Sequence, residues 1–94
     1  MEIREIIIKG HPSDRMIQRG IEYADVENAI LYGYIKLIGT EDGLPVYQAI
    51  CPKFGKYVTV IYCSYRNCAY VKTVRRSNQS EIKLYKKRCK GVIN

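Results

Sequence analysis

After Gly33 the sequence changes from a helical pattern to a strand-like one, and this change restricts the fold more than any other feature. Four runs rich in β-branched and aromatic residues follow, separated by turn signals such as Glu41-Asp42-Gly43 and Pro52-Lys53-Phe54-Gly55. Strands joined by such short turns pair antiparallel. We therefore expect most of a sheet from these runs: YIKLIG at 34–39, LPVYQAIC at 44–51, KYVTVIYC at 56–63 and CAYVKTVRR at 68–76.

The residues before Gly33 predict one strand and two short helices. The isoleucine-rich run at 2–9 is typical of a strand. Pro12 fits the first helical position, with His11 as the cap, and Gly20 closes that helix. A second helix extends to Gly33, because apolar residues recur there at helical spacing.

This order of elements predicts an α+β domain over residues 1–76. Two N-terminal helices pack on one face of a mainly antiparallel sheet of four to five strands. The chain of 94 residues is long enough for one such domain with a modest core. The pattern predicts that the buried residues include Val26, Ile30, Val58, Val60 and Val74.

Three residues on the first predicted helix, His11, Arg15 and Arg19, are spaced four apart. At about 100° per residue they fall within an arc of roughly 80° and form one stripe. Such a stripe has two interpretations. It is either the solvated side of an amphipathic helix or a functional surface.

The side chains of this stripe can act together on a phosphodiester. A neutral imidazole accepts a proton, and a guanidinium group binds two phosphate oxygens and stabilises a pentacoordinate transition state. RNA cleavage by attack of a ribose 2′-hydroxyl on the adjacent phosphate uses these groups without a metal ion. In this interpretation His11 is the general base or acid, while Arg15 and Arg19 bind phosphate. No metal and no cofactor are expected.

Positive charge is concentrated at the C-terminal end. Residues 1–71 carry eight Lys/Arg and eight Asp/Glu, whereas residues 72–94 carry eight Lys/Arg against Glu81 alone, so this end supplies the net charge of +7. Such a surface suits a polyanion, although a tail that only solubilises the chain has the same composition. Residues 77–94 are expected to form a basic tail with some helical character. The candidates for nucleic-acid binding are Arg75, Arg76, Lys83, Lys86, Lys87 and Arg88.

Several protein classes are not expected from this sequence. It has no run of about 18 apolar residues, so we expect no membrane span. Charged residues at 2, 4 and 5 are unlike a secretory signal, and a cytoplasmic protein is expected. The four cysteines lack a Cys-x-x-Cys pair, which favours reduced thiols over a zinc site.

The stretch HPSDRMIQRGIEYADVENAILYG at 11–33 resembles the signature of a small bacterial family, domain of unknown function 4258. The signature reads His-x-x-x-Arg-Met-x-x-Arg-Gly-Ile, then a helix with Asp-Val and Ala-Ile, then Gly. The family is similar in fold to the RelE and BrnT ribonuclease toxins. The resemblance therefore implies a RelE-like fold, RNA as a partner and an antitoxin protein as another.

The resemblance extends to AYVKTVRR at 69–76, the closing strand, which commonly carries a threonine, here Thr73. Alternation along a strand places Val71, Thr73 and Arg75 on one face. Only one of the two faces of this strand can line the same cleft as the helix stripe. The family resemblance favours the face with Thr73 and Arg75, and it adds Thr73 to the catalytic candidates.

The sequence leaves two main functions open. The first is a toxin-like, metal-independent endoribonuclease that belongs to a toxin–antitoxin system. The second is a non-catalytic module of the same fold that binds nucleic acid or a protein. A purely structural accessory domain is a third interpretation, and the oligomeric state is not predicted.

Overall fold

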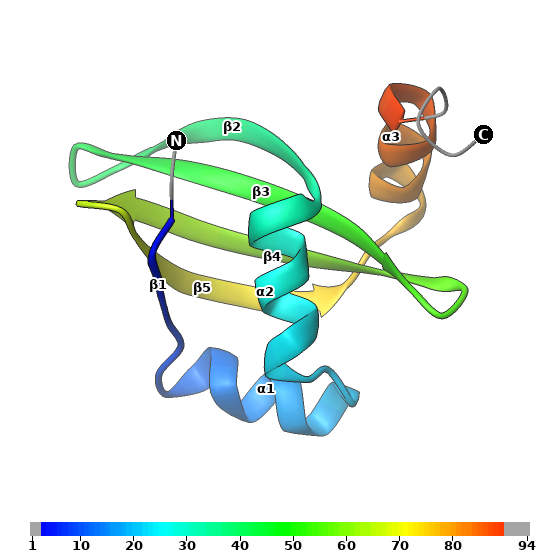
Figure 1. The fold of residues 1–94 in the computed structure, drawn as a ribbon, viewed down its shortest axis with the longest axis horizontal. Helices are drawn as coiled ribbons and strands as arrows, with labels where there is room; N and C mark the ends of the chain where they lie inside the picture. Colours follow the sequence, from blue (N-terminus) through cyan, green and yellow to red (C-terminus); the bar gives the residue numbers. More distant parts are fainter. Residues whose placement is uncertain (1–2, 90–94) are drawn as a thin grey trace.

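The four expected strands form a meander (Figure 1), and helices pack on both of its faces. The computed structural model describes residues 3–89, which form an α+β fold with a five-stranded mixed sheet and three helices. The elements in chain order are β1 (Glu5–Ile7), α1 (His11–Arg19), α2 (Tyr23–Tyr32), β2 (Tyr34–Glu41), β3 (Leu44–Lys53), β4 (Lys56–Tyr65), β5 (Cys68–Arg76) and α3 (Gln79–Cys89).

Each hairpin of the meander turns through a pair of residues in the left-handed region. Two consecutive positive φ values are the mark of a type I′ turn, whose twist matches that of the flanking strands. The antiparallel register from β2 to β5 follows from these tight turns. The pairs with positive φ at both residues are Asp42-Gly43, Phe54-Gly55 and Arg66-Asn67.

β1 does not belong to the meander. The strand order is β1-β5-β4-β3-β2, and β1 pairs parallel with β5, so the sheet is mixed where we expected it to be mainly antiparallel. The two helices and three strands between them provide the connection that a parallel pair needs. β1 is also shorter than the expected run at 2–9, whose residue 2 lies outside the described residues. It reaches only Cys68–Tyr70 of β5.

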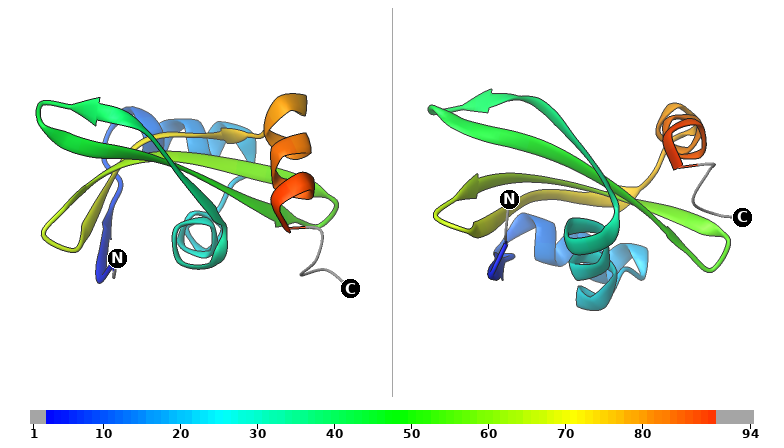
Figure 2. Two further views of the ribbon diagram at one scale, coloured as in Figure 1. Left: turned by 90° about the horizontal axis from the view of Figure 1, so that it is seen from above. Right: turned by 45° about the horizontal axis from the view of Figure 1, so that its top comes forward.

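Helices α1 and α2 lie on one face of the sheet and enclose the core (Figure 2). The five residues expected in the core are each at most 5% exposed, which confirms that prediction. They come from α2 and from the central strands, and side chains of α2 pack on β3 and β4. This set is Val26, Ile30, Val58, Val60 and Val74.

α1 buries only a narrow side. Pro12 and Met16 of the helix are buried, as is Ile21 just after it, but Ile17 is 80% exposed. α1 packs beside β5 at the margin of the sheet, where one row of side chains, Pro12 and Met16 at i and i+4, makes the contact.

Gly33 connects α2 directly to β2 and allows a close approach of two backbones. A Cβ atom at this position would lie 2.5 Å from the carbonyl oxygen of Ala29 and 2.6 Å from that of Ile50. Backbone atoms of a helix and a strand cannot move aside without disturbing both. Glycine is therefore required for space, and it holds the end of α2 against β3.

α3 packs on the face of the sheet opposite α1 and α2 (Figure 2). Part of the segment expected as a basic tail is thus a docked helix, whereas residues 90–94 lie outside the described residues. The ring of Tyr85 lies 5.5 Å from the ring of Tyr57 on β4, at a tilt of 59°. The basic side chains of α3 are therefore presented from a fixed support.

Ile30→Ala is expected to lower the free energy of unfolding by about 2 to 5 kcal/mol, because the side chain is 5% exposed within the core. Leu31→Ala, at the next position and 41% exposed, is the control and should cost about 1 kcal/mol or less. Urea unfolding measures both. Equal losses for the two variants would contradict the placement of Ile30 in the core.

Candidate functional site

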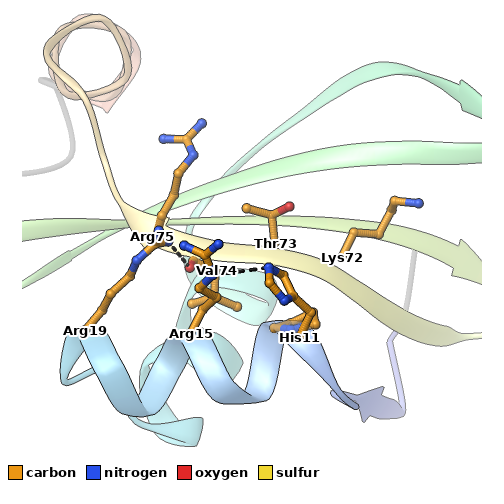
Figure 3. A pocket seen from close by; sticks show the side chains of 8 residues that line it. His11, Arg15, Arg19, Lys72, Thr73, Val74 and Arg75 are labelled. Atoms are coloured by element: carbon orange, nitrogen blue, oxygen red, sulfur yellow. Dashed lines mark hydrogen bonds between the residues drawn. The ribbon is translucent and has the colours of Figure 1, made fainter.

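The candidate site is a groove of about 240 Å³ between α1 and β5. Because β1 ends opposite Tyr70, the outer edge of β5 has no strand neighbour among residues 3–89 beyond that point, and α1 runs beside it (Figure 3). The lining contains no carboxylate and several cationic groups, so its potential favours an anion. The lining residues are His11, Pro12, Arg15, Arg19, Lys72, Thr73, Val74 and Arg75.

The stripe of His11, Arg15 and Arg19 lies in this groove. α1 begins one residue earlier than expected, since Gly10, with φ of 64°, is the N-cap and His11 is the first helical residue. Arg15 Nε donates a hydrogen bond to His11 Nε2 at 3.1 Å (Figure 3). An imidazole nitrogen that accepts a hydrogen bond carries no proton, so this arrangement assigns the imidazole proton to Nδ1.

Arg19 joins α1 to the open edge of β5. Its Nη1 donates to the carbonyl oxygen of Val74 at 2.8 Å. The Ser77 N–H donates to the carbonyl oxygen of Tyr57, so these two residues form a hydrogen-bonded pair between β4 and β5. In an antiparallel ladder every second residue points its backbone N–H and C=O toward the neighbouring strand, and the residues between point theirs the other way. Val74 is one of those between, so its N–H and C=O point to the open edge. The Val74 N–H is therefore one more donor that faces the groove.

A β-bulge decides which side chains of β5 face α1. The pairing of β4 with β5 shifts at Lys72, so Val71 and Val74 both lie on the core face. The expectation that Val71 shares a face with Thr73 and Arg75 is wrong for this reason. Figure 3 shows the Thr73 and Arg75 side chains directed away from α1, on the far side of the strand.

Arg75 is engaged elsewhere. Its guanidinium forms two hydrogen bonds with Glu81 of α3, Nη1 to Oε1 at 2.6 Å and Nη2 to Oε2 at 2.7 Å. A bidentate pair of this kind occupies the donors that would grip a phosphate. The structure therefore does not bring Arg75 to the stripe as a substrate-binding group, although its stem lines the rim of the groove.

Glu81 is the residue that sequence reasoning missed. It is 5% exposed, and besides Arg75 it accepts hydrogen bonds from Thr59 Oγ1 at 3.0 Å and Gln48 Nε2 at 2.8 Å. Glu81 and Asn78 also form a reciprocal capping box at the start of α3. Its only signal in the sequence was its position as the single acid in a basic segment.

The buried carboxylate of Glu81 is stabilised in its charged form. Burial alone would raise its pKa, but the hydrogen bonds from Arg75, from the backbone of Asn78 and from Thr59 outweigh burial and lower the pKa. The ionised carboxylate thus holds α3 on the sheet through one partner on each of β3, β4 and β5.

Lys72 is a groove residue that sequence analysis did not select. It lies at the bulge of β5, and its Nζ forms an ion pair with Glu41 of β2. The hydrogen bond to Glu41 is the main cause that raises the pKa of Lys72. The lysine therefore stays charged, but Figure 3 shows its side chain directed away from α1, like those of Thr73 and Arg75. Alternation along the strand could not reveal its direction, because the bulge interrupts it.

The other basic candidates lie outside this groove. Arg76 Nη2 donates to the carbonyl oxygen of Arg19 at 3.3 Å, so Arg76 lies on the α1 side of β5 at the end of the groove. Four more candidates are exposed on α3, which packs on the opposite face of the sheet. These are Lys83, Lys86, Lys87 and Arg88.

Residues 8–76 match a family described as "Domain of unknown function (DUF4258)". The chain belongs to this family. The DUF4258 match starts directly after β1 and ends with the last residue of β5, so it includes every residue of the groove. Helix α3 lies outside the matched DUF4258 region. Neither a curated protein nor a solved structure matches the chain.

Among residues 3–89, no group of three or more His, Cys, Asp or Glu side chains is placed to hold a metal ion. No helix in that range has the length and apolar character needed to span a bilayer. Cys51, Cys63, Cys68 and Cys89 are free thiols.

Glu81→Gln is expected to lower the free energy of unfolding by about 1 to 3 kcal/mol at neutral pH, because a buried neutral amide cannot satisfy Arg75 as a carboxylate does. Urea unfolding and the near-UV signal of the tyrosines measure the change. Glu27→Gln, an exposed position on α2, is the matched control and should change stability little.

The same pair of variants tests the pH dependence. Since folding lowers the pKa of Glu81, its contribution is present above the ordinary glutamate pKa of about 4.3 and is lost as the pH falls through the folded-state pKa. The stability difference between the wild type and Glu81→Gln should therefore shrink below about pH 4. A difference that stays constant down to pH 2 would contradict the lowered pKa.

Proposed function

We propose that this DUF4258 domain is a toxin-like endoribonuclease that cleaves RNA by attack of a ribose 2′-hydroxyl on the adjacent phosphate. One observation carries the proposal: His11 Nε2 and Arg15 Nε are in contact at 3.1 Å in a groove lined by cationic groups. A proton acceptor and a phosphate-binding group at that separation can act on neighbouring atoms of one phosphodiester.

In the proposed reaction His11 removes the proton from the 2′-hydroxyl while that oxygen attacks phosphorus. The bond between phosphorus and the 5′ oxygen then breaks, and the departing oxygen takes a proton from water. The hydroxide ion left behind takes the proton held by His11, which restores the neutral imidazole. The products are a 2′,3′-cyclic phosphate and a 5′-hydroxyl end. One phosphorus–oxygen bond is exchanged for another within the RNA, so the step needs no oxidant, reductant or second substrate.

Arg15 has two parts in this mechanism. Without substrate, its Nε–H occupies the lone pair of His11 Nε2. A phosphate in the groove competes for the same guanidinium, because a charged acceptor binds it more strongly than a neutral imidazole does. Phosphate binding would then release the His11 lone pair for the 2′-hydroxyl, which couples substrate binding to activation of the base.

Arg19 supports this chemistry through charge and position. It holds α1 against β5 through its bond to Val74, and it lines the groove beside Arg15. Together with the Val74 N–H, it would stabilise the extra negative charge on phosphorus in the transition state. Lys72 points away from α1 and is paired with Glu41, so it adds only positive charge at a distance.

We further propose that the domain shares the RelE-like fold and acts with an antitoxin protein. The support is the signature at 11–33 and the order of two helices followed by a four-stranded meander. An antitoxin that blocks the enzyme would place acidic side chains in the cationic groove. Such a partner would be recognised by the loss of RNA cleavage when it is added.

A second candidate function is a non-catalytic RNA-binding domain. The observation that favours it is again the contact of Arg15 with His11, because a histidine whose lone pair is occupied positions an arginine rather than accepting a proton. Here the groove would bind phosphate without cleaving it. Neither function assigns a part to Thr73, whose side chain points away from α1.

His11→Ala separates the two functions. We expect it to reduce RNA cleavage about a hundredfold to ten thousandfold, the usual contribution of an acid–base group, while the melting temperature changes little because His11 is exposed. Gln18→Ala, also exposed on α1, is the control. Cleavage of purified free and ribosome-bound RNA is the measurement. Full activity of His11→Ala would overturn the catalytic assignment, whereas RNA binding without any cleavage by the wild type would favour the binding domain.

Arg15→Lys tests the guanidinium itself. Lysine keeps the charge but loses the planar fork that binds two phosphate oxygens, so we expect cleavage to fall at least about tenfold. Retained RNA binding at low salt would show that the loss concerns the transition state. Unchanged cleavage would mean that Arg15 supplies only charge to the groove.

A further inference from the structure

A second groove lies at the end of the molecule where β5 passes into α3. Its volume is about 320 Å³, and it is formed by the β3–β4 turn, the end of β5 and the first turns of α3. Figure 2 shows this turn, the C-terminal end of α1 and α3 at the same end of the molecule. The lining residues are Gly55, Lys56, Tyr57, Arg76, Ser77, Gln79, Ile82 and Lys86.

Three exposed cations from three different elements meet in this second groove. Lys56 comes from the start of β4, Arg76 from the end of β5 and Lys86 from α3. The lining contains no carboxylate, and the nearby Glu81 is occupied by Arg75. Like charges gathered in this way repel one another, so the arrangement favours an anionic ligand between them.

The two grooves are connected through one contact. Arg76 lines the second groove, and its Nη2 donates to the backbone oxygen of Arg19 at 3.3 Å. Arg19 in turn lines the first groove. The cationic groups therefore follow one another from the α1 stripe, past Arg76, to the second groove. A chain of phosphates could lie along this path, whereas an isolated small anion would use only one end of it.

Aromatic rings accompany the cations in the second groove. The Tyr57 ring lines it and is held by Tyr85 at a centroid distance of 5.5 Å. Phe54, on the adjacent turn, is 98% exposed but does not line this groove. Aromatic rings beside cations are the combination by which proteins bind single-stranded nucleic acids, since bases stack on rings while phosphates bind the cations.

We propose that the second groove is a phosphate-binding and base-binding subsite for single-stranded RNA. It holds a nucleotide of the same strand whose cleaved phosphate lies in the first groove. The subsite rests on the proposed function and deepens it, because it makes single-stranded RNA longer than a dinucleotide the preferred substrate. Lys86 belongs to α3 and lies outside the matched family region.

The test compares two double variants that remove the same charge. Lys56→Gln with Lys86→Gln removes two cations of the second groove, while Lys36→Gln with Arg66→Gln removes two exposed cations that line neither groove. Arg76 is left intact because it also contacts Arg19. The probes are a fluorescent 2′-O-methyl oligouridylate of about 12 nucleotides, which cannot be cleaved, and the cleavable dinucleotide UpU.

We expect the groove variant to bind the long probe about 25-fold more weakly at 0.1 M salt, because each lost phosphate contact is worth about fivefold there. The slope of log affinity against log salt should become shallower by about 1.4. Cleavage of UpU should stay unchanged, since a dinucleotide reaches only the first groove. The control variant should resemble the wild type in all three measurements.

Equal weakening by the groove variant and the control variant would overturn the subsite while leaving the proposed function intact. A loss of the same size in Lys83→Gln with Lys87→Gln would also overturn it, because α3 would then bind RNA through its whole basic surface. If the wild type neither binds the long probe nor cleaves UpU, the proposed function fails and the subsite fails with it.

Discussion

The outer edge of β5 is the constraint from which the site follows. A strand edge presents backbone groups that need hydrogen-bond partners, and beyond Tyr70 no other strand supplies them in residues 3–89. Arg19 satisfies one of them by donating to the Val74 carbonyl oxygen. This bond fixes α1 parallel to the edge, and helical geometry then places Arg15 and His11 one and two turns further along the same groove.

Strand alternation gives the two adjacent arginines of β5 different roles, one structural and one available to a ligand. Arg75 and Arg76 are neighbours in sequence, yet their side chains lie on opposite faces of β5. Arg75 pairs with the buried Glu81 and fixes α3, so its charge is neutralised inside the protein. Arg76 stays on the α1 side, where no carboxylate lines either groove, and its charge remains available to a ligand.

The docking of α3 through a single carboxylate links the stability of the fold to the second groove. Glu81 receives hydrogen bonds from β3, β4 and β5 as well as from its own capping box, so α3 has one defined position on the sheet. That position brings Lys86 within one groove with residues of β4 and β5. A helix held only by apolar contacts could slide along the sheet, whereas a bidentate ion pair specifies one register.

The sequence alone determined the local features of this protein. Helix caps and helical spacing identified both N-terminal helices, and β-rich runs bounded by turn signals identified all five strands, because these signals reflect local backbone preference and which side of an element is buried. Spacing of four residues placed His11, Arg15 and Arg19 on one stripe, and the signature around them identified the family. These features need only neighbouring residues, and the structure retains them.

Only the tertiary structure decided what depends on residues far apart in the chain. Pairing of β1 with β5 leaves an open edge, the bulge at Lys72 turns Thr73 and Arg75 away from α1, and the margin position of α1 exposes Ile17. Glu81 looked like one acid in a basic tail, yet it is the anchor of α3. Such outcomes arise from long-range pairing energies and from burial, which local periodicity does not encode.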